Sequence, residues 1–222
     1  MHGFSRLHHI LFLVLLGCAA TPASAAPLRF FATGDAPYAP AEMPQLQRLF
    51  VAAIVQWTPF LVHLGDIKSG STPCADNGYR EDDPAAMDEF KRRDKVNRAA
   101  LRRAARLANE RGARAMVLLF HADPFFHMNR SPRGFAATRR ALVRLMAEYA
   151  GPVLLIHGDT HGFKHDRPLI DPGTGLPFPR FVRAEVPGSP VVGGIWVSVD
   201  PDADEPFAVE EVYPLSLDVL EK

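Results

Sequence analysis

Four apolar, β-prone runs of this chain are each followed by acidic or histidine side chains. The runs cover residues 30–33, 60–64, 116–120 and 153–156, and the polar residues after them are Asp35; Asp66; His121 and Asp123; and His157, Asp159 and His161. Buried parallel strands read as continuous apolar runs, and α/β proteins bind their ligands beyond the carboxyl ends of such strands. We therefore expect the four run ends to converge on one site, and carboxylates with imidazoles predict a metal there.

Five of these residues have the types that a two-metal hydrolase needs. In such an enzyme a carboxylate bridges two ions roughly 3.5–4 Å apart, and the pair activates water and clamps a phosphoryl group. Asp159 and His161 are two residues apart, so both can turn inward on an irregular loop. The predicted metal ligands are Asp35, Asp66, His121, Asp159 and His161.

Simpler interpretations apply to some of these residues individually. A lone Gly-Asp step after a strand is common, so Asp35 or Asp66 taken alone favours a turn or a helix cap. His63 is predicted to be a packed side chain, and Asp123 before Pro124 suits a turn. The segment 157–161 is more specific, because three potential ligands directly after buried aliphatic residues are costly to place without a partner.

The elements that must position these residues alternate between strand-like and helix-like patterns, which predicts an α/β fold. Apolar residues at three- or four-residue spacing predict helices over 43–57, from Asp83-Pro84 to Gly112, and from Ser131-Pro132 to Gly151-Pro152. After His161 the pattern changes, and residues 181–186, 191–199 and 207–212 read as short strands. Length and pattern predict one domain over residues 26–222.

The first 25 residues read as a signal peptide. A short apolar run, Ile10–Leu16, is too short to span a membrane and precedes the small-residue pattern Ala23-Ser24-Ala25. Leu15-Leu16-Gly17-Cys18 also resembles a lipobox, so a lipid anchor at Cys18 is an alternative. Either interpretation predicts an exported protein, periplasmic or secreted, without a transmembrane helix.

The remaining composition excludes some partners. The formal net charge is zero, which gives no basic footprint for nucleic acid. Lys and Arg gather between Lys91 and Arg114, interleaved with Asp and Glu, as on the solvated face of a helix. Once residues 1–25 are removed, Cys74 is the only cysteine, which is unusual for an exported protein.

Three motifs together resemble those of the calcineurin-like metallophosphoesterases, in a secreted bacterial branch. They are Gly34-Asp35-Ala36-Pro37-Tyr38, Gly65-Asp66-Ile67-Lys68 and His157-Gly158-Asp159-Thr160-His161. The resemblance implies a β-sandwich flanked by helices and two divalent ions of the Mn, Fe or Zn type. It further implies that Asp35 binds the first ion, Asp66 bridges both, and His121, Asp159 and His161 complete the set. A metal-bound hydroxide would hydrolyse a phosphate mono- or diester, with catalytic Lys68 and His157 steadying the developing charge.

The chain also departs from this family. A central motif that supplies a metal-binding Asn has no counterpart, since neither Asn77 nor Asn97 follows a strand. We interpret this as an internal deletion within about residues 76–87, which would also have removed the cysteine partner of Cys74. Pro37 stands where the family's first motif has His. Tyr38 and Lys68 are candidate substrate contacts.

Three hypotheses follow. The chain is an exported metal-dependent phosphoesterase, or it is a non-catalytic member that acts as a binding module or is a remnant. As a third hypothesis, the loss of central strands leaves unpaired sheet edges and an unstable protein.

Overall fold

The computed structural model describes residues 13–15, 27–66, 84–126 and 135–214. Several sequence predictions therefore lie outside the described residues. Among them are the signal cleavage site, the lipobox Cys18, Lys68, Cys74 and most of the expected deletion.

The chain forms two mixed sheets. The first has the order β1-β4-β5-β7-β6, and the second has the order β3-β2-β8-β9. Their strands are β1 (Leu13–Leu15), β2 (Leu28–Thr33), β3 (Leu61–His63), β4 (Met116–Leu119), β5 (Val153–His157), β6 (Lys164–Asp166), β7 (Phe181–Glu185), β8 (Gly194–Val199) and β9 (Phe207–Val212). Strands β4, β5 and β7 run parallel, as do β2 and β3. The structure confirms the α/β prediction at this level.

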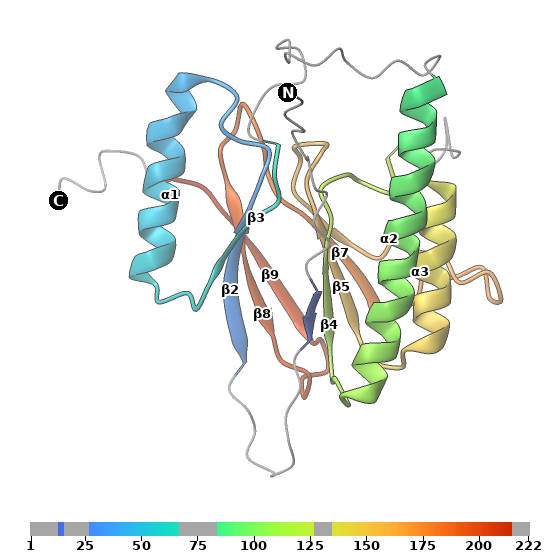
Figure 1. The fold of residues 1–222 in the computed structure, drawn as a ribbon. Coiled ribbons are helices and arrows are strands. Elements are labelled where there is room, and N and C mark those ends of the chain that lie inside the picture. Colours follow the sequence, from blue (N-terminus) through green and yellow to red (C-terminus); the bar gives the residue numbers. More distant parts are fainter. Residues whose placement is uncertain (1–12, 16–26, 67–83, 127–134, 215–222) are drawn as a thin grey trace.

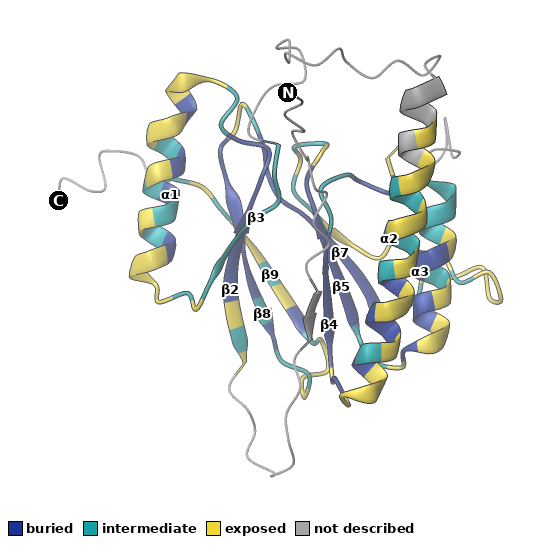
Figure 2. Ribbon diagram, in the orientation of Figure 1, coloured by how far each residue is buried: buried dark blue, intermediate teal, exposed yellow. Residues whose placement is uncertain are grey.

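The two sheets pack face to face between helical layers (Figure 1). One apolar cluster joins them and includes Phe30 and Ala32 of β2, Ile156 of β5 and Val197 of β8. Strands β4 and β5 are buried along their whole length, as continuous apolar runs predict for strands covered on both faces (Figure 2). The predicted arrangement of a sandwich flanked by helices is therefore present among the described residues.

Three α-helices cover the outer faces. Helix α1 (Met43–Val55) packs on the β2–β8 side through Leu46, Leu49 and Ala53. Helices α2 (Pro84–Glu110) and α3 (Ala136–Glu148) cover β4 and β5. The starts of α1 and α2 match the sequence prediction. Helix α3 begins at Ala136, and the predicted start at Ser131-Pro132 lies outside the described residues.

Two strands are not predicted by the sequence, for different reasons. Strand β6 is only three residues long and polar, and it is placed by its antiparallel pairing with β7. Strand β1 lies inside the predicted signal peptide, where it pairs antiparallel with β4. The three predicted C-terminal strands are confirmed as β7, β8 and β9.

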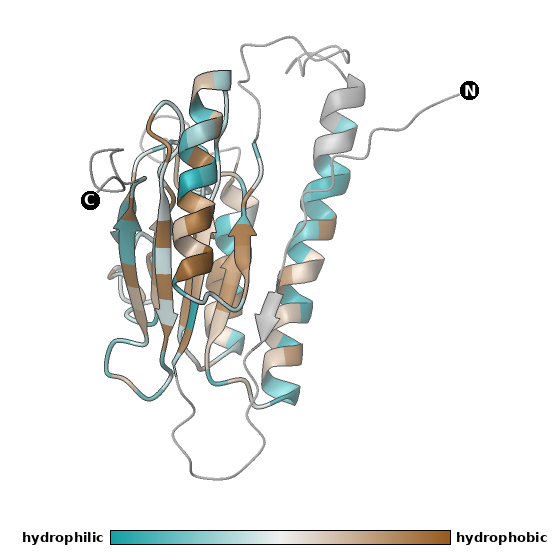
Figure 3. Ribbon diagram, turned by 90° about the vertical axis from the view of Figure 1, so that its left-hand side faces the viewer, coloured by the Kyte–Doolittle hydropathy of each residue, from teal (hydrophilic) through white to brown (hydrophobic). Residues whose placement is uncertain are grey.

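The outer surface of α1 carries exposed apolar side chains near its carboxyl end. Ile54 and Val55 are more than two-thirds exposed, and Trp57 just beyond the helix is 93% exposed. Figure 3 shows this hydrophobic end of α1 facing the viewer. No helix in the described ranges is long and apolar enough to cross a bilayer.

Candidate metal centre

The loops after β2 and β3 lie against one another at the same end of the second sheet. The two strands are parallel neighbours, and their pairing continues past their ends. The backbone N–H of Leu64 donates to Thr33 O at 2.8 Å, and that of Asp35 donates to Gly65 O at 3.0 Å. These bonds bring the first two Gly-Asp motifs together.

Three predicted ligands form one group. One ligand atom each from Asp35, Asp66 and His161 lies within 4.8 Å of the other two. The residues come from the ends of β2, β3 and β5, and therefore from both sheets. Carboxylate oxygens and an imidazole nitrogen at this spacing are a donor set that could hold a divalent ion of the Mn, Fe or Zn type.

Unusual backbone conformations accompany this group. Asp35, Asp66, Asp159 and His161 all have positive φ, at 52°, 54°, 85° and 63°. The only other described non-glycine residue with positive φ is Trp57. Left-handed conformations cost roughly 1–2 kcal/mol each in L-residues and persist only where surrounding structure fixes them. Such conformations cluster at ligand-binding and active sites, which makes these loops a candidate functional site.

Asp35 is the most deeply buried member of the group. Its Oδ2 accepts the backbone N–H of Asp159 at 2.7 Å, and its Oδ1 lies 3.7 Å from Nδ1 of His121. Oδ1 is fully buried and accepts no hydrogen bond from a described residue. Burial raises the pKa of Asp35 to about 6, although the Asp159 N–H and the charges of His121 and His161 act in the opposite direction.

The Oδ1 atom of Asp35, which is buried and accepts no hydrogen bond from a described residue, suits a ligand of a bound cation. A buried oxygen without a partner is rare and costly, and a cation would satisfy it. His121 is close enough to Asp35 to share such an ion. The residues present therefore fit a divalent metal.

His161 is oriented by a segment that the sequence analysis did not select. Its Nδ1 lies 2.6 Å from the carbonyl oxygen of Ser189, which assigns the proton to Nδ1 and leaves Nε2 as an acceptor facing Asp66. The Ser189 hydroxyl in turn donates to the buried Glu42 at 2.7 Å. The only sequence signal for this support was the turn composition Pro187-Gly188-Ser189-Pro190.

Tyr38 closes one side of the group. Its hydroxyl donates to Asp66 Oδ2 and lies 3.2 Å from Nε2 of His161. Burial and the neighbouring Asp66 raise the pKa of Tyr38 well above its usual range. The phenol therefore stays protonated at neutral pH and can donate a hydrogen bond here.

His63 braces the two aspartate loops. Its Nδ1 accepts the Gly65 N–H at 3.1 Å, and its Nε2 lies 3.0 Å from the carbonyl oxygen of Ala36. Burial lowers its pKa, so the ring is neutral. The sequence predicts a packed side chain for His63, and the half-buried ring additionally links the backbones beside Asp35 and Asp66.

The Asp159 carboxylate points elsewhere. Its Oδ2 accepts the backbone N–H of Asp123 at 3.0 Å, and only its own N–H reaches Asp35. Asp159 thus joins the first group to a second one, formed by the buried side chains of Asp123, His157 and Glu185.

The second group is neutralised by cations. Lys164 Nζ contacts Glu185, and Arg183 contacts Asp123 at 3.4 Å. The geometry of its ligand atoms could also hold an ion. The two cations already compensate the carboxylates, so the Asp35 group is the stronger candidate for an ion.

His157, which was predicted to act near the substrate, belongs to this second group. It is fully buried, with Nδ1 2.7 Å from Gly158 O and Nε2 3.6 Å from the Asp123 carboxylate. Burial lowers its pKa, so it is neutral at pH 7. Its position suits support of the loop 158–161 rather than contact with a substrate.

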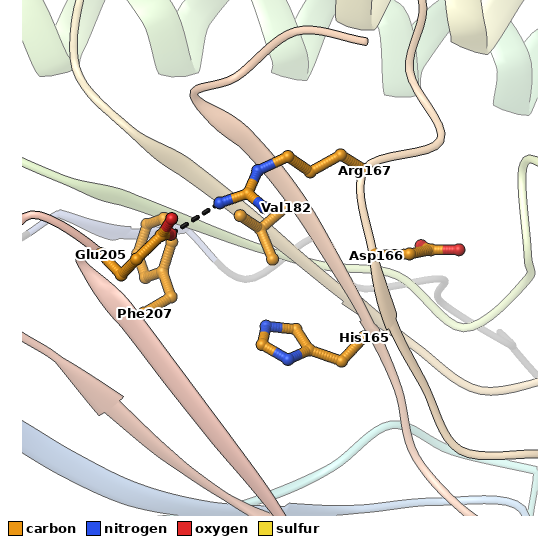
Figure 4. Close-up of a pocket in the computed structure, with 6 residues that line it drawn as sticks. All are labelled: His165, Asp166, Arg167, Val182, Glu205 and Phe207. Carbon is orange, nitrogen blue, oxygen red and sulfur yellow. Dashed lines mark hydrogen bonds and ion pairs between the residues drawn. The ribbon is translucent and has the colours of Figure 1, made fainter.

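A cavity of about 240 Å³ is lined by no member of either group (Figure 4). It is lined by His165, Asp166, Arg167, Val182, Glu205 and Phe207, and an Arg167–Glu205 ion pair of 2.6 Å crosses one side. None of the predicted ligands lines it.

Comparison of the chain with protein-family models, with curated proteins and with solved structures gave no match.

Proposed function

We propose that this chain is an exported metal-dependent phosphoesterase with its metal centre at Asp35, Asp66 and His161. The observation that carries the proposal is the convergence of these three ligand atoms within 4.8 Å. They come from three strand ends, and all three residues adopt left-handed backbone conformations. The motif resemblance to calcineurin-like metallophosphoesterases supplies the reaction class.

The residues beside the three ligands decide whether the centre binds one ion or two. His121 lies beside Asp35 and is the candidate to extend the set toward a second ion. A bound divalent ion would supply positive charge for a phosphoryl group and would acidify water. Residues of the chain would contact the substrate and hold the metal ligands in position.

Tyr38 is the residue best placed to contact a phosphate ester. It is neutral and its hydroxyl lies between Asp66 and His161. Its single O–H, which donates to Asp66 in this structure, can turn to donate to a phosphoryl or leaving-group oxygen instead. Asp159 fixes the Asp35 carboxylate through its backbone N–H, and His63 holds the two loops in place.

A second function, metal binding without catalysis, is favoured by one observation. The Asp159 carboxylate is turned toward Asp123 and does not join the Asp35 group. With the central Asn motif absent as well, the centre would hold one ion and act as a binding module.

The decisive experiment measures metal content and hydrolysis on the same preparation. The full chain is purified without chelating resin, and bound metal is quantified by mass spectrometry. Hydrolysis of p-nitrophenyl phosphate and bis-p-nitrophenyl phosphate is then assayed with added Mn²⁺. We expect Asp66→Ala to lower activity by more than about a hundredfold, since even the outer partners of metal ligands typically contribute 10–100-fold.

Matched variants separate the alternatives. Tyr38→Phe should retain metal while losing most of the turnover, whereas Asp204→Ala, an exposed carboxylate, should leave both unchanged. One ion per chain with no hydrolysis would select the binding module. Hydrolysis that survives Asp66→Ala unchanged would exclude the proposed centre.

A further inference from the structure

Four arginines surround a shallow groove between α2 and α3. Arg98 and Arg102 project from α2 one turn apart, and Arg140 and Arg144 project from α3 one turn apart. The small side chains of Ala137 and Ala141 complete the lining, and the groove encloses about 40 Å³. No carboxylate is part of this lining.

The charges around the groove are poorly compensated. Arg98 is paired with Asp94 at 2.9 Å. Among the described residues, Arg102, Arg140 and Arg144 make no ion pair or hydrogen bond. Like charges one helical turn apart repel each other. Burial and the charge of Arg140 lower the pKa of the neighbouring Arg139.

This surface includes part of the charged run 91–114, which the sequence predicts to be a mixed, solvated helix face. The run lies mainly on α2, and most of its charged side chains are exposed. Folding also brings two of its arginines beside two from α3, which are about forty residues away in sequence. A local positive site thus exists in a chain whose formal net charge is zero.

We propose that this groove binds a phosphate group, presented either by a free phosphate compound or by a phospholipid headgroup. Guanidinium groups match the oxygens of phosphate through paired, charge-assisted hydrogen bonds. The small volume admits one tetrahedral anion, and the alanine floor permits close approach. The four guanidinium groups carry four positive charges, and the Asp94 carboxylate that pairs with Arg98 neutralises only one of them.

The groove is separate from the metal centre. Helices α2 and α3 cover the outer face of the first sheet, and the two sites share no residue. The inference therefore does not depend on the proposed phosphoesterase activity.

Titration calorimetry on the full chain provides the test. Inorganic phosphate and pyrophosphate are titrated at 0.15 M salt, with a chelator present so that the metal centre does not contribute. We expect saturable binding near one site per chain. Arg102→Gln/Arg144→Gln should weaken it at least tenfold, while the melting temperature stays unchanged because both side chains are exposed.

A matched variant controls for overall charge. Arg103→Gln/Arg106→Gln removes the same charge from α2 outside the groove, and it should leave affinity within about twofold. Equal weakening by both double variants would overturn the proposal, because binding would then follow net charge. Absence of binding to phosphate, pyrophosphate and vesicles would also overturn it.

Vesicles distinguish the two sources of the phosphate group. Co-sedimentation is measured with vesicles of an anionic phospholipid and with neutral phosphatidylcholine vesicles. Binding to the anionic vesicles that Arg102→Gln/Arg144→Gln abolishes assigns a headgroup ligand. Binding of pyrophosphate without vesicle binding assigns a free phosphate compound. Binding to an acidic peptide with none to either phosphate source would refute the proposed ligand class.

Discussion

The backbone N–H of Asp159 donates a 2.7 Å hydrogen bond to the Oδ2 atom of Asp35, across 124 residues of sequence. The bond joins the loop after β5 to the loop after β2, and so connects the two sheets at the candidate metal centre. It requires a close approach that only glycine permits at position 158. A Cβ atom at Gly158 would lie 2.1 Å from Asp35 Oδ2.

Gly158→Ala should therefore separate the two loops. We expect a loss of about 1–3 kcal/mol in the free energy of unfolding, the usual cost of overpacking, together with loss of bound metal. Gly162→Ala is the matched control, because nothing lies within 4 Å of its added Cβ. Urea denaturation and metal analysis of both variants provide the measurement. Equal behaviour of the two variants would contradict the close approach.

The stability of the metal-free protein should depend on Asp35 and pH. Burial raises the Asp35 pKa from 3.8 to about 6, so the folded state holds this proton more tightly than the unfolded chain does. The stabilisation is complete below pH 3.8 and is lost as pH rises through about 6. The loss corresponds to about 3 kcal/mol at neutral pH.

Asp35→Asn removes this titration while keeping an acceptor for the Asp159 N–H. In the presence of a chelator, the variant should melt at a higher temperature than wild type at pH 7.5. The difference should shrink toward pH 4. Asp204→Asn, at the surface, serves as the control. A pH profile of Asp35→Asn that parallels wild type would assign the dependence to another group.

We expect Lys164 to stabilise the folded protein mainly by neutralising the buried carboxylate of Glu185. Glu185 is fully buried and contacts Lys164 Nζ together with the hydroxyl and N–H of Thr160. Lys164→Met leaves this charge uncompensated. We expect a loss of about 2–3 kcal/mol in the free energy of unfolding, below the roughly 3–5 kcal/mol typical of a fully buried pair, because Lys164 is one-third exposed.

The double variant Lys164→Met/Glu185→Gln tests the coupling. Removing the charge with its partner should recover more than half of that loss, as measured by urea denaturation in a double-mutant cycle. Simply additive costs would show that the pair is not coupled.

Replacement of Trp57 should stabilise the protein. Trp57 lies just past the carboxyl end of α1 with φ 56°, a position that favours glycine, and its side chain is 93% exposed. Trp57→Gly should gain about 0.5–1 kcal/mol after the entropic cost of glycine is subtracted. Trp57→Ala loses the same indole but keeps the strained geometry, so its melting temperature should stay below that of the glycine variant. The reverse order would point to an unobserved partner of the indole.

Much of this fold is readable in the sequence because its central strands, β4 and β5, are buried along their whole length. The apolar runs before Asp35, Asp66, His121 and His157 correspond to β2, β3, β4 and β5. Their order with three amphipathic helices predicts parallel strands whose carboxyl ends converge. The convergence of Asp35, Asp66 and His161 follows from that topology.

Side-chain direction was less predictable. Asp159 and His157 have suitable types and spacing, yet both side chains are drawn to the buried Asp123 group. The cations that stabilise that group, Lys164 and Arg183, come from β6 and β7, and one of these strands has no sequence pattern of its own. The support of His161 by the Ser189 carbonyl is likewise a backbone contact, which residue types do not encode.

The antiparallel pairing of β1 with β4 places residues 13–15 at the edge of the first sheet, beside the apolar strand β4. If residues 1–25 are removed, as the sequence predicts, β4 becomes the edge strand. Its unpaired backbone groups are then open to pairing with another chain.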